Sequence, residues 1–264
     1  VICCGGGNAG CGDVTKRGWH RPLHVGGSNG PKSGTPATGL TDGKLAVTND
    51  GGGIAAALVT VLRSSGIDAD IVDDLSASSA VSFVFLGGLR EVSSVDEAVA
   101  INREAFDAAR AFKKGSAEGG LFVTISDLGG DFGLGGSSLS NGQGDRAWSG
   151  GLGGLAKTAA IEWPSTTVRS IDVARGGRSA GTIAGAIANE LLSGGSELEI
   201  GLGADGERVT LRSRPVAVQP GVQPMGESDV IVVSGGGRGV TAATMIELAR
   251  DTKATFVLLG RSAL

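Results

Sequence analysis

Short apolar runs alternate with longer stretches of helical periodicity along most of the chain. The short runs have apolar residues at consecutive positions, which is typical of strands covered on both faces, whereas the longer stretches space apolar residues three or four positions apart. The predicted strands are 44–50, 67–74, 81–88, 119–130 and 167–173, and the predicted helices are 54–66, 95–114, 145–164 and 180–195.

The ends of these elements carry residues that cap helices and turn the chain. Ser94 is placed to cap the helix that begins at Val95, whose first turn also carries carboxylates that favour the positive end of the helix dipole. Pro164 ends the helix that precedes it. Residues 197–218 are predicted to form a hairpin that turns at 204–206.

Strands separated by helices of this length predict βαβ units, and therefore a mostly parallel sheet with helices on both faces. The strand residues of such a sheet are buried. Those expected in the core are Val47, Val84, Phe85, Val123, Ile125, Ile171 and Val173.

The pattern restarts after a Pro/Gly-rich linker. In both copies a strand, a glycine turn, a helix and a second strand follow one another, and Asp50-Gly51-Gly52-Gly53 corresponds to Ser234-Gly235-Gly236-Gly237. We therefore expect an α/β fold of tandem Rossmann type, with a complete structural (pseudo-Rossmann) subdomain and the first βαβ unit of a second Rossmann subdomain. The expected domains are a flexible Gly-rich leader at 1–40, the structural subdomain at 41–218, a linker at 219–227 and the beginning of the nucleotide-binding subdomain at 228–264.

All three cysteines and both histidines lie in the leader. A zinc site would use Cys4, Cys11, His20 and His24, because thiolate and imidazole groups suit tetrahedral zinc. Their spacing fits no common zinc-finger pattern, and the segment lacks the apolar residues that a finger packs around its metal. We expect no metal site and a reduced, flexible leader.

Charge and composition narrow the class of partner. The net charge is −4 and the basic residues are scattered, so nucleic acid and an anionic membrane are not expected partners. No apolar run reaches the roughly 18 residues that span a bilayer, and no targeting leader begins the chain. These features predict a soluble, cytoplasmic protein. Tyrosine is absent from the sequence.

The second glycine turn has the features of a dinucleotide-binding turn. Such a turn needs glycines because the backbone must bend sharply and approach a pyrophosphate, while the following helix offers free N–H groups and a positive dipole. The predicted cofactor contacts at this turn are Ser234, Gly235, Gly236, Gly237, Arg238, Gly239 and Val240. The alternative is a tight strand-to-helix turn that binds nothing.

A second feature specifies the cofactor. The strand after the helix ends at Arg261 and Ser262, where the adenosine ribose of a dinucleotide would lie. An acidic residue at this position favours NAD, whereas an arginine accommodates the 2′-phosphate of NADP. The sequence therefore favours NADPH, with Arg261 and Ser262 as cofactor contacts.

The first glycine turn is different. Asp50 stands at its entrance, where a negative charge would repel phosphate, and Asp73 and Asp74 follow its second strand. We interpret this copy as a structural unit that binds no cofactor.

Three stretches resemble the ketoreductase domain of multifunctional polyketide and polyunsaturated fatty acid synthases, in the short-chain dehydrogenase/reductase superfamily. They are LFVTISDLGGDFGL, WSGGLGGLAKTAAIEWP followed by VRSIDV, and VIVVSGGGRGVTAATMIELA followed by FVLLGRS. The turn resembles the TGxxxGxG form, with Ser234 in place of Thr and Thr241 in place of the last Gly. The SGGGRGVTA variant is closer to the polyunsaturated fatty acid synthases.

The resemblance implies that the intact domain reduces a β-ketoacyl group on an acyl carrier protein with NADPH, beside neighbouring synthase domains of fatty acid biosynthesis. The family's catalytic Tyr, Ser and Lys lie beyond the second strand of the catalytic subdomain. Since the chain has no tyrosine and ends at Leu264, we assign no catalytic residue and expect a truncated domain that is inactive alone. Lys157 is predicted to be a helix-surface lysine.

Two alternatives to a reductase fragment remain open. One is a non-catalytic scaffold module of a synthase, and the other is an unrelated Rossmann-type nucleotide-binding protein. We also expect the terminal βαβ unit to be weakly held, because its sheet lacks further strands.

Overall fold

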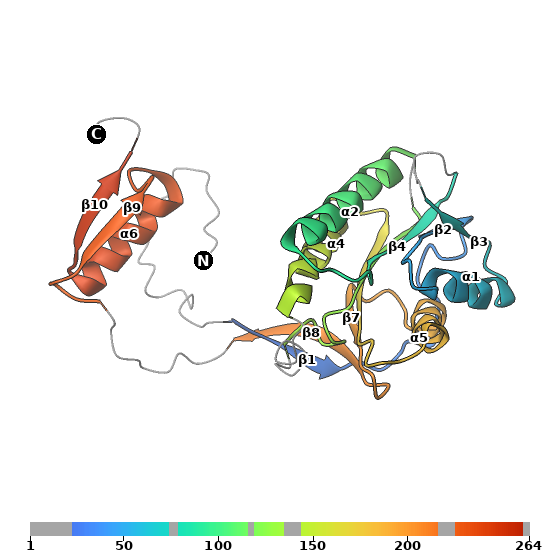
Figure 1. Ribbon diagram of the computed structural model, residues 1–264. Coiled ribbons are helices and arrows are strands. Elements are labelled where there is room, and N and C mark those ends of the chain that lie inside the picture. Colours follow the sequence, from blue (N-terminus) through green and yellow to red (C-terminus); the bar gives the residue numbers. More distant parts are fainter. Residues whose placement is uncertain (1–22, 74–78, 116–118, 135–143, 216–224, 261–264) are drawn as a thin grey trace. The chain divides into compact units, whose positions relative to one another are not determined.

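A computed structural model describes residues 23–73, 79–115, 119–134, 144–215 and 225–260. The chain forms two compact units, one spanning Val25–Arg214 and the other containing Pro215–Leu264 (Figure 1).

The large unit is built around an eight-stranded sheet. The strands follow the order β1-β8-β7-β6-β5-β4-β2-β3; β2 to β7 are parallel to their neighbours in this group, and β8 is antiparallel to β7. The strands are β1 (Leu23–Asn29), β2 (Leu45–Thr48), β3 (Ala69–Val72), β4 (Ser82–Gly88), β5 (Leu121–Ser126), β6 (Thr167–Val173), β7 (Glu199–Leu202) and β8 (Arg208–Pro215).

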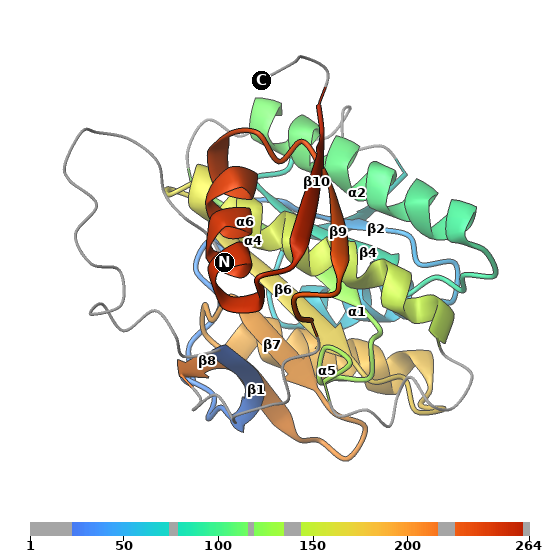
Figure 2. The same ribbon diagram turned by 90° about the vertical axis from the view of Figure 1, so that its left-hand side faces the viewer.

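Helices cover both faces of this sheet, with α1 and α5 on one face and α2 and α4 on the other (Figures 1 and 2). Successive residues of a strand point to opposite faces. In β4, Val84 and Leu86 therefore enter the core with α1 and α5, whereas Phe83 and Phe85 enter the core with α2 and α4. The helices are α1 (Ile54–Ser64), α2 (Val95–Gly115), η3 (Gly144–Gly150), α4 (Gly151–Glu162) and α5 (Ala180–Ser193).

The predicted α/β fold with a mostly parallel sheet is confirmed. The N–H of Glu97 donates to Ser94 Oγ (3.2 Å), so Ser94 caps α2 as predicted. Strands β7 and β8 form the predicted hairpin, and Gly206 in its turn has a φ of 89°. The strand residues expected in the core are all fully buried, namely Val47, Val84, Phe85, Val123, Ile125, Ile171 and Val173.

The helix predicted at 145–164 is in fact two helices, a 3-10 helix (η3) followed by α4. Asn102 of α2 lies against the junction, where its Nδ2 donates to the carbonyl of Trp148 (3.1 Å). A Cβ on Gly151 would lie 2.3 Å from Asn102 Oδ1. The junction between η3 and α4 therefore lies where Asn102 of α2 contacts it. The local sequence pattern does not reveal this tertiary contact.

The prediction of a flexible leader at 1–40 is wrong for 23–40. Strand β1 pairs with β8 at the edge of the sheet. The segment that follows lies against the end of α5, where the N–H of Gly34 donates to the carbonyl of Ser193 (2.9 Å), and Leu40 is fully buried. The last carbonyls of a helix lack partners within it, so backbone hydrogen bonds hold this segment without a periodic apolar pattern.

A buried charge cluster fastens this edge of the unit. The carboxylate of Glu190 in α5 pairs with Arg169 of β6 and with Arg208 of β8 (2.8 Å from Arg208 Nε to Glu190 Oε2), and all three side chains are buried. Arg208 also donates to the carbonyls of Gly30 and Gly194 (2.8 and 3.0 Å). The carboxylate of Glu190 thus links α5 to β6 and β8, and Arg208 in turn links this cluster to the segment after β1.

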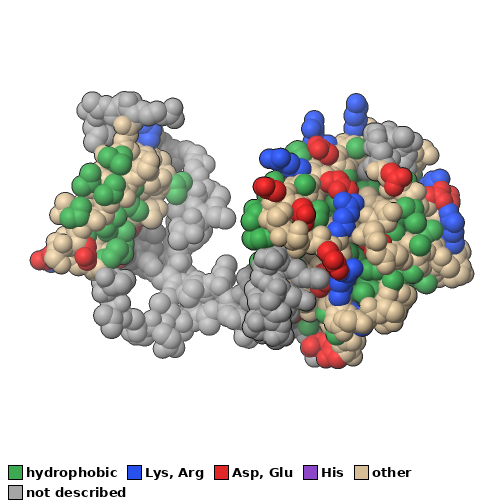
Figure 3. Space-filling model, in the orientation of Figure 1, with side chains coloured by type: hydrophobic (Ala, Val, Ile, Leu, Met, Phe, Trp, Pro, Cys, Tyr) green, Lys and Arg blue, Asp and Glu red, His purple; other side chains and the backbone are tan. Residues whose placement is uncertain are grey.

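The small unit contains a single βαβ element. Strands β9 (Val230–Ser234) and β10 (Thr255–Leu259) pair in parallel, and α6 (Gly239–Thr252) lies along them (Figure 2). Apolar side chains remain on its surface (Figure 3). Among the described residues of this unit, no element covers the sheet face that carries Val230, Val232, Val257 and Leu259, whose side chains are between 41% and 64% exposed.

The cluster around Glu190 gives a prediction about stability and pH. Burial alone would raise the pKa of Glu190, but hydrogen bonds from Arg208 and Arg169 outweigh it and hold the pKa below its usual value. Glu190→Gln would leave two buried arginines without a counter-charge and lower the unfolding free energy by about 3–5 kcal/mol at neutral pH. Urea unfolding measures this loss.

Because the folded pKa of Glu190 is depressed, its stabilising effect is present above the unfolded pKa of about 4.3 and is lost as pH falls through the folded pKa. Wild-type protein should therefore lose more stability than Glu190→Gln over this acidic range. Arg212→Gln, which breaks only the exposed pair with Glu197, is the matched control and should cost less than about 1 kcal/mol. Equal losses in the two variants would contradict the interpretation.

Candidate nucleotide-binding site

The glycine turn of the small unit connects β9 to α6. Gly235 and Gly239 have φ values of 76° and 67°, a region that glycine adopts without strain. A Cβ on Gly236 would lie 2.7 Å from Cδ2 of Leu258 in β10. Gly237 is exposed. The backbone therefore favours glycine at Gly235 and Gly239, and a side chain at Gly236 would displace Leu258.

The first turn of α6 is open. The N-cap residue Arg238 has an extended backbone and makes no side-chain capping hydrogen bond, and no side chain of the described residues accepts a hydrogen bond from the first turn of the helix. Ser234 is exposed and the Val240 side chain is 52% exposed. The N–H of Gly235 donates to the carbonyl of Leu259 (2.7 Å), which holds the turn against β10. An open helix N-terminus offers free N–H groups and a positive dipole to an anion.

The structure brings Ser234 to Val240 together on this turn. The other two predicted contacts, Arg261 and Ser262, lie outside the described residues. The parallel register places Leu259 beside Ser234, so β10 ends at the same edge of the sheet at which the turn begins.

The corresponding turn of the large unit, between β2 and α1, is filled by a carboxylate of the protein. Asp50 Oδ2 accepts hydrogen bonds from the N–H groups of Gly52 and Ile54 (2.9 and 3.2 Å), and Oδ1 accepts one from the N–H of Ala55 (2.8 Å). Asp50 is buried. The N–H groups that would hold a phosphate here are therefore already bonded, which is a stronger obstacle than charge repulsion alone.

Other residues from the sequence interpretation lie away from both turns. Asp73 is exposed after β3, and Asp74 lies outside the described residues. Lys157 Nζ pairs with Glu199 Oε1 (3.0 Å) and its side chain is 52% exposed, so its prediction as a surface lysine of α4 is confirmed.

A second carboxylate at the same edge of the large sheet is missing from the sequence interpretation. Asp172, near the end of β6, accepts hydrogen bonds from the N–H groups of Leu128, Gly130 and Phe132 (2.6, 2.7 and 2.9 Å). Burial raises the pKa of Asp172, and the hydrogen bonds from Leu128 and Phe132 oppose that shift. An acidic residue between Ile171 and Val173, both expected in the core, is the signal that could have revealed it.

The described residues hold no cluster of three or more His, Cys, Asp or Glu side chains suited to a metal ion. Cys4, Cys11 and His20 of the zinc alternative lie outside that part of the chain. Within the same residues, no helix combines the length and apolar character needed to cross a membrane.

The fold is similar to that of solved structures that contain ketoreductase domains. A structure with adenylation, ketoreductase and pseudo-Asub domains from a keto acid-selecting NRPS module matches 94% of this chain with a TM-score of 0.63 and 15% identity, over 24% of its own length. A C2-type ketoreductase from a modular polyketide synthase matches 89% with a TM-score of 0.53 and 16% identity, over 53% of its length.

A sequence match connects the chain with a particular synthase. Over 123 residues it is 37% identical to a polyunsaturated fatty acid synthase polypeptide of Thraustochytrium sp., and the match covers 44% of this chain and 4% of that protein. No protein-family model matches the sequence. The resemblance to synthase ketoreductase domains, predicted from three stretches of sequence, is confirmed.

The role of Asp50 at the first turn gives a second prediction. Asp50→Ala would leave three backbone N–H groups at the start of α1 without their acceptor, and we expect a loss of about 2 kcal/mol in unfolding free energy. Chemical denaturation followed by circular dichroism measures it. Asp73→Ala removes an exposed carboxylate from the same unit and should change stability by less than about 0.5 kcal/mol. A comparable effect of both substitutions would rule out the capping role.

Proposed function

We propose that the chain forms the structural subdomain and the first βαβ unit of the catalytic subdomain of an NADPH-dependent β-ketoacyl reductase. The observation that carries the proposal is the contrast between two similar turns within a ketoreductase fold. Asp50 fills the N-terminus of α1, whereas the N-terminus of α6 is open behind Gly235, Gly236 and Gly239. The cofactor pyrophosphate binds at the second turn.

The cofactor is a nicotinamide dinucleotide, and the sequence after β10 favours its phosphorylated form. Arg261 contacts the adenosine 2′-phosphate, with Ser262 as a second partner. Ser234 and Arg238 flank the pyrophosphate from the two ends of the turn. An arginine beside a phosphate makes a charge-assisted hydrogen bond, which NADH cannot offer.

The substrate is a β-ketoacyl thioester carried by an acyl carrier protein. Hydride from NADPH adds to the β-carbonyl carbon and a proton adds to its oxygen, which gives the β-hydroxyacyl thioester. The family's proton donor is a tyrosine, and this sequence has none. We infer that further sequence of the same reductase supplies the Tyr, Ser and Lys, and that its strands extend the sheet of β9 and β10.

The domain division under this proposal follows the two compact units. Residues from about 25 to 214 belong to the structural subdomain, the following residues to about 227 to a linker, and 228–264 to the nucleotide-binding subdomain. The Thraustochytrium relative is part of a synthase, and the match covers only 4% of it, which supports neighbouring synthase domains as partners.

The missing tyrosine also favours a second candidate, a non-catalytic module that only supports neighbouring synthase domains. The two candidates differ in whether the complete polypeptide binds and oxidises NADPH.

Activity separates the two candidates. The 264-residue chain alone should not reduce a β-ketoacyl thioester such as acetoacetyl-CoA, because general-acid catalysis needs a proton donor within hydrogen-bond reach of the carbonyl. The longer natural polypeptide should do so. The loss of NADPH absorbance on addition of thioester measures both. Thioester-dependent oxidation by the 264-residue chain would refute the assignment of roles, and none by the longer polypeptide would favour the scaffold.

Cofactor selectivity tests Arg261. In the longer natural polypeptide, Arg261→Ala should weaken NADPH binding roughly 10- to 100-fold and leave NADH binding nearly unchanged, since hydrogen bonds to charged groups contribute on the order of 1.5–3 kcal/mol. Titration of NADPH and NADH fluorescence measures both affinities. Arg250→Ala, at an exposed arginine of α6, is the control and should affect neither. Equal losses for the two cofactors would show that Arg261 acts structurally.

A further inference from the structure

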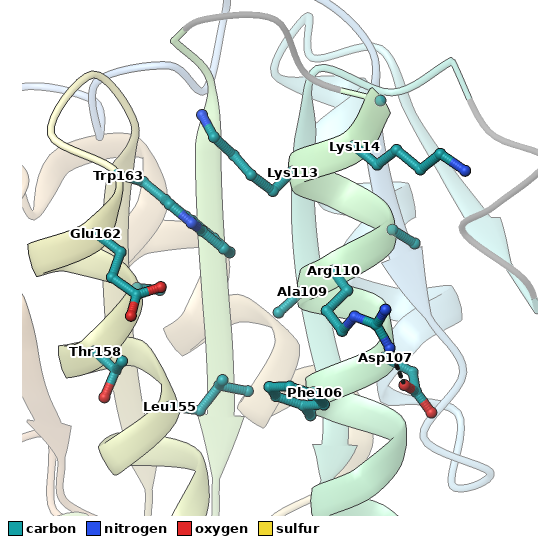
Figure 4. Close-up of a pocket in the computed structure, with 13 residues that line it drawn as sticks. Phe106, Asp107, Ala109, Arg110, Lys113, Lys114, Leu155, Thr158, Glu162 and Trp163 are labelled. Atoms are coloured by element: carbon teal, nitrogen blue, oxygen red, sulfur yellow. Dashed lines mark ion pairs between the residues drawn. The ribbon is translucent and has the colours of Figure 1, made fainter.

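An apolar groove lies between α2 and α4 on the outer surface of the large unit (Figure 4). Its volume is about 1010 Å³. Phe106 and Ala109 of α2 line one side, and Leu155 of α4 and Trp163 line the other. These two helices cover the same face of the sheet, so the groove opens away from the strands.

The walls of the groove are held in place from beneath. The indole of Trp163 packs against the rings of Phe112 and Phe122, with centroids 6.0 and 5.5 Å apart. Phe106, by contrast, is 53% exposed. An exposed aromatic ring beside a fixed indole can form a pocket that binds an apolar side chain of a partner protein.

The two edges of the groove differ in charge. The α2 edge carries Arg110, Lys113, Lys114 and the carboxylate of Asp107. Lys113 extends over the groove near Trp163, Lys114 points away from α4, and Glu162 faces the groove from α4 (Figure 4). Lys113 and Lys114 form no ion pair with any residue in the described part of the chain. Lys and Arg side chains also project from this surface in Figure 3.

Existing contacts account for part of these features, because the guanidinium of Arg110 lies over the ring of Phe106, with its Cζ 5.9 Å from the ring centroid. Arg110 pairs with Asp107 at 3.9 Å, but both side chains are over 70% exposed, so this pair contributes little. Lysines in a last helical turn do complement the helix dipole. The dipole explains neither the exposed Phe106 nor the hollow beside Trp163.

We propose that this groove binds an amphipathic helix of another polypeptide or synthase domain, with its acidic edge against α2. One apolar side chain of the helix enters between Phe106, Leu155 and Trp163, and its carboxylates face Lys113 and Arg110. Helix-in-groove recognition of this kind uses apolar residues at helical spacing for affinity, and the charged edges set the orientation. The inference does not depend on the proposed reductase activity.

The test uses the 264-residue chain and two designed, dye-labelled helical peptides of about 16 residues. Both carry the same Leu/Phe stripe, and one has Glu where the other has Lys along one edge. Fluorescence anisotropy should show saturable binding of the Glu peptide and about tenfold weaker binding of the Lys peptide. Phe106→Ser should weaken binding of the Glu peptide by at least about tenfold, because the substitution removes the aromatic ring against which the peptide's apolar side chain packs.

Charge reversal tests the orientation. Lys113→Glu should weaken binding of the Glu peptide about three- to tenfold and strengthen binding of the Lys peptide. Arg103→Glu and Ile161→Ser alter exposed residues of α2 and α4 that do not line the groove, and should change neither affinity. Unchanged circular dichroism melting confirms that each variant folds.

Three outcomes would overturn the proposal. The first is equal binding of the two peptides, and the second is an equal effect of Lys113→Glu and Arg103→Glu. The third is a concentration-dependent dimer in sedimentation that Phe106→Ser abolishes, which would assign the groove to a second copy of this chain.

Discussion

Every helix that follows a parallel strand presents free N–H groups at the carboxyl edge of the sheet, and each buried N–H needs an acceptor. In the large unit these acceptors are side chains of the protein itself, hydroxyl groups of Ser94 and Ser179 at α2 and α5 and a carboxylate at α1. Asp50 bonds the start of α1, and Asp172 bonds the loop after β5. Ligands of open α/β sheets bind at this edge, and these carboxylates occupy the N–H groups of two of its loops. At the start of α6 no side chain of the described residues takes this role, so the same turn stays available.

The central strands β2, β4 and β5 could be predicted because apolar residues on both of their faces are buried. Phe83-Val84-Phe85-Leu86 supplies two cores from four consecutive residues. The segment 23–40 could not, since it is held by edge pairing of β1 and by backbone hydrogen bonds to the end of α5. Nothing in its own composition specifies these partners, because they come from residues far away in the sequence.

The charge cluster and the candidate site show two further limits of sequence reasoning. Glu190 follows Ile187 by three positions on the buried face of α5, and Arg169 lies in the buried strand β6. Two opposite charges at core positions are a readable signal for a buried pair. The sequence indicates that Asp50 is unfavourable to phosphate, but its bonds to the helix start appear only in the structure. For the second turn, the sequence locates the glycines on which the backbone conformation depends. Arg261 itself lies outside the described residues.

The two faces of the large sheet differ in how closely their helices approach. Helices α1 and α5 are in direct contact, and their buried side chains belong to one core cluster. On the other face, the bulky Phe106 stands on α2 and the groove separates α2 from α4. Asp50 and Asp172 occupy backbone N–H groups at the carboxyl edge, whereas the outer surface of α2 and α4 keeps an open groove. The side chains that these helices expose can therefore contribute specificity in recognition without any ligand at the sheet edge.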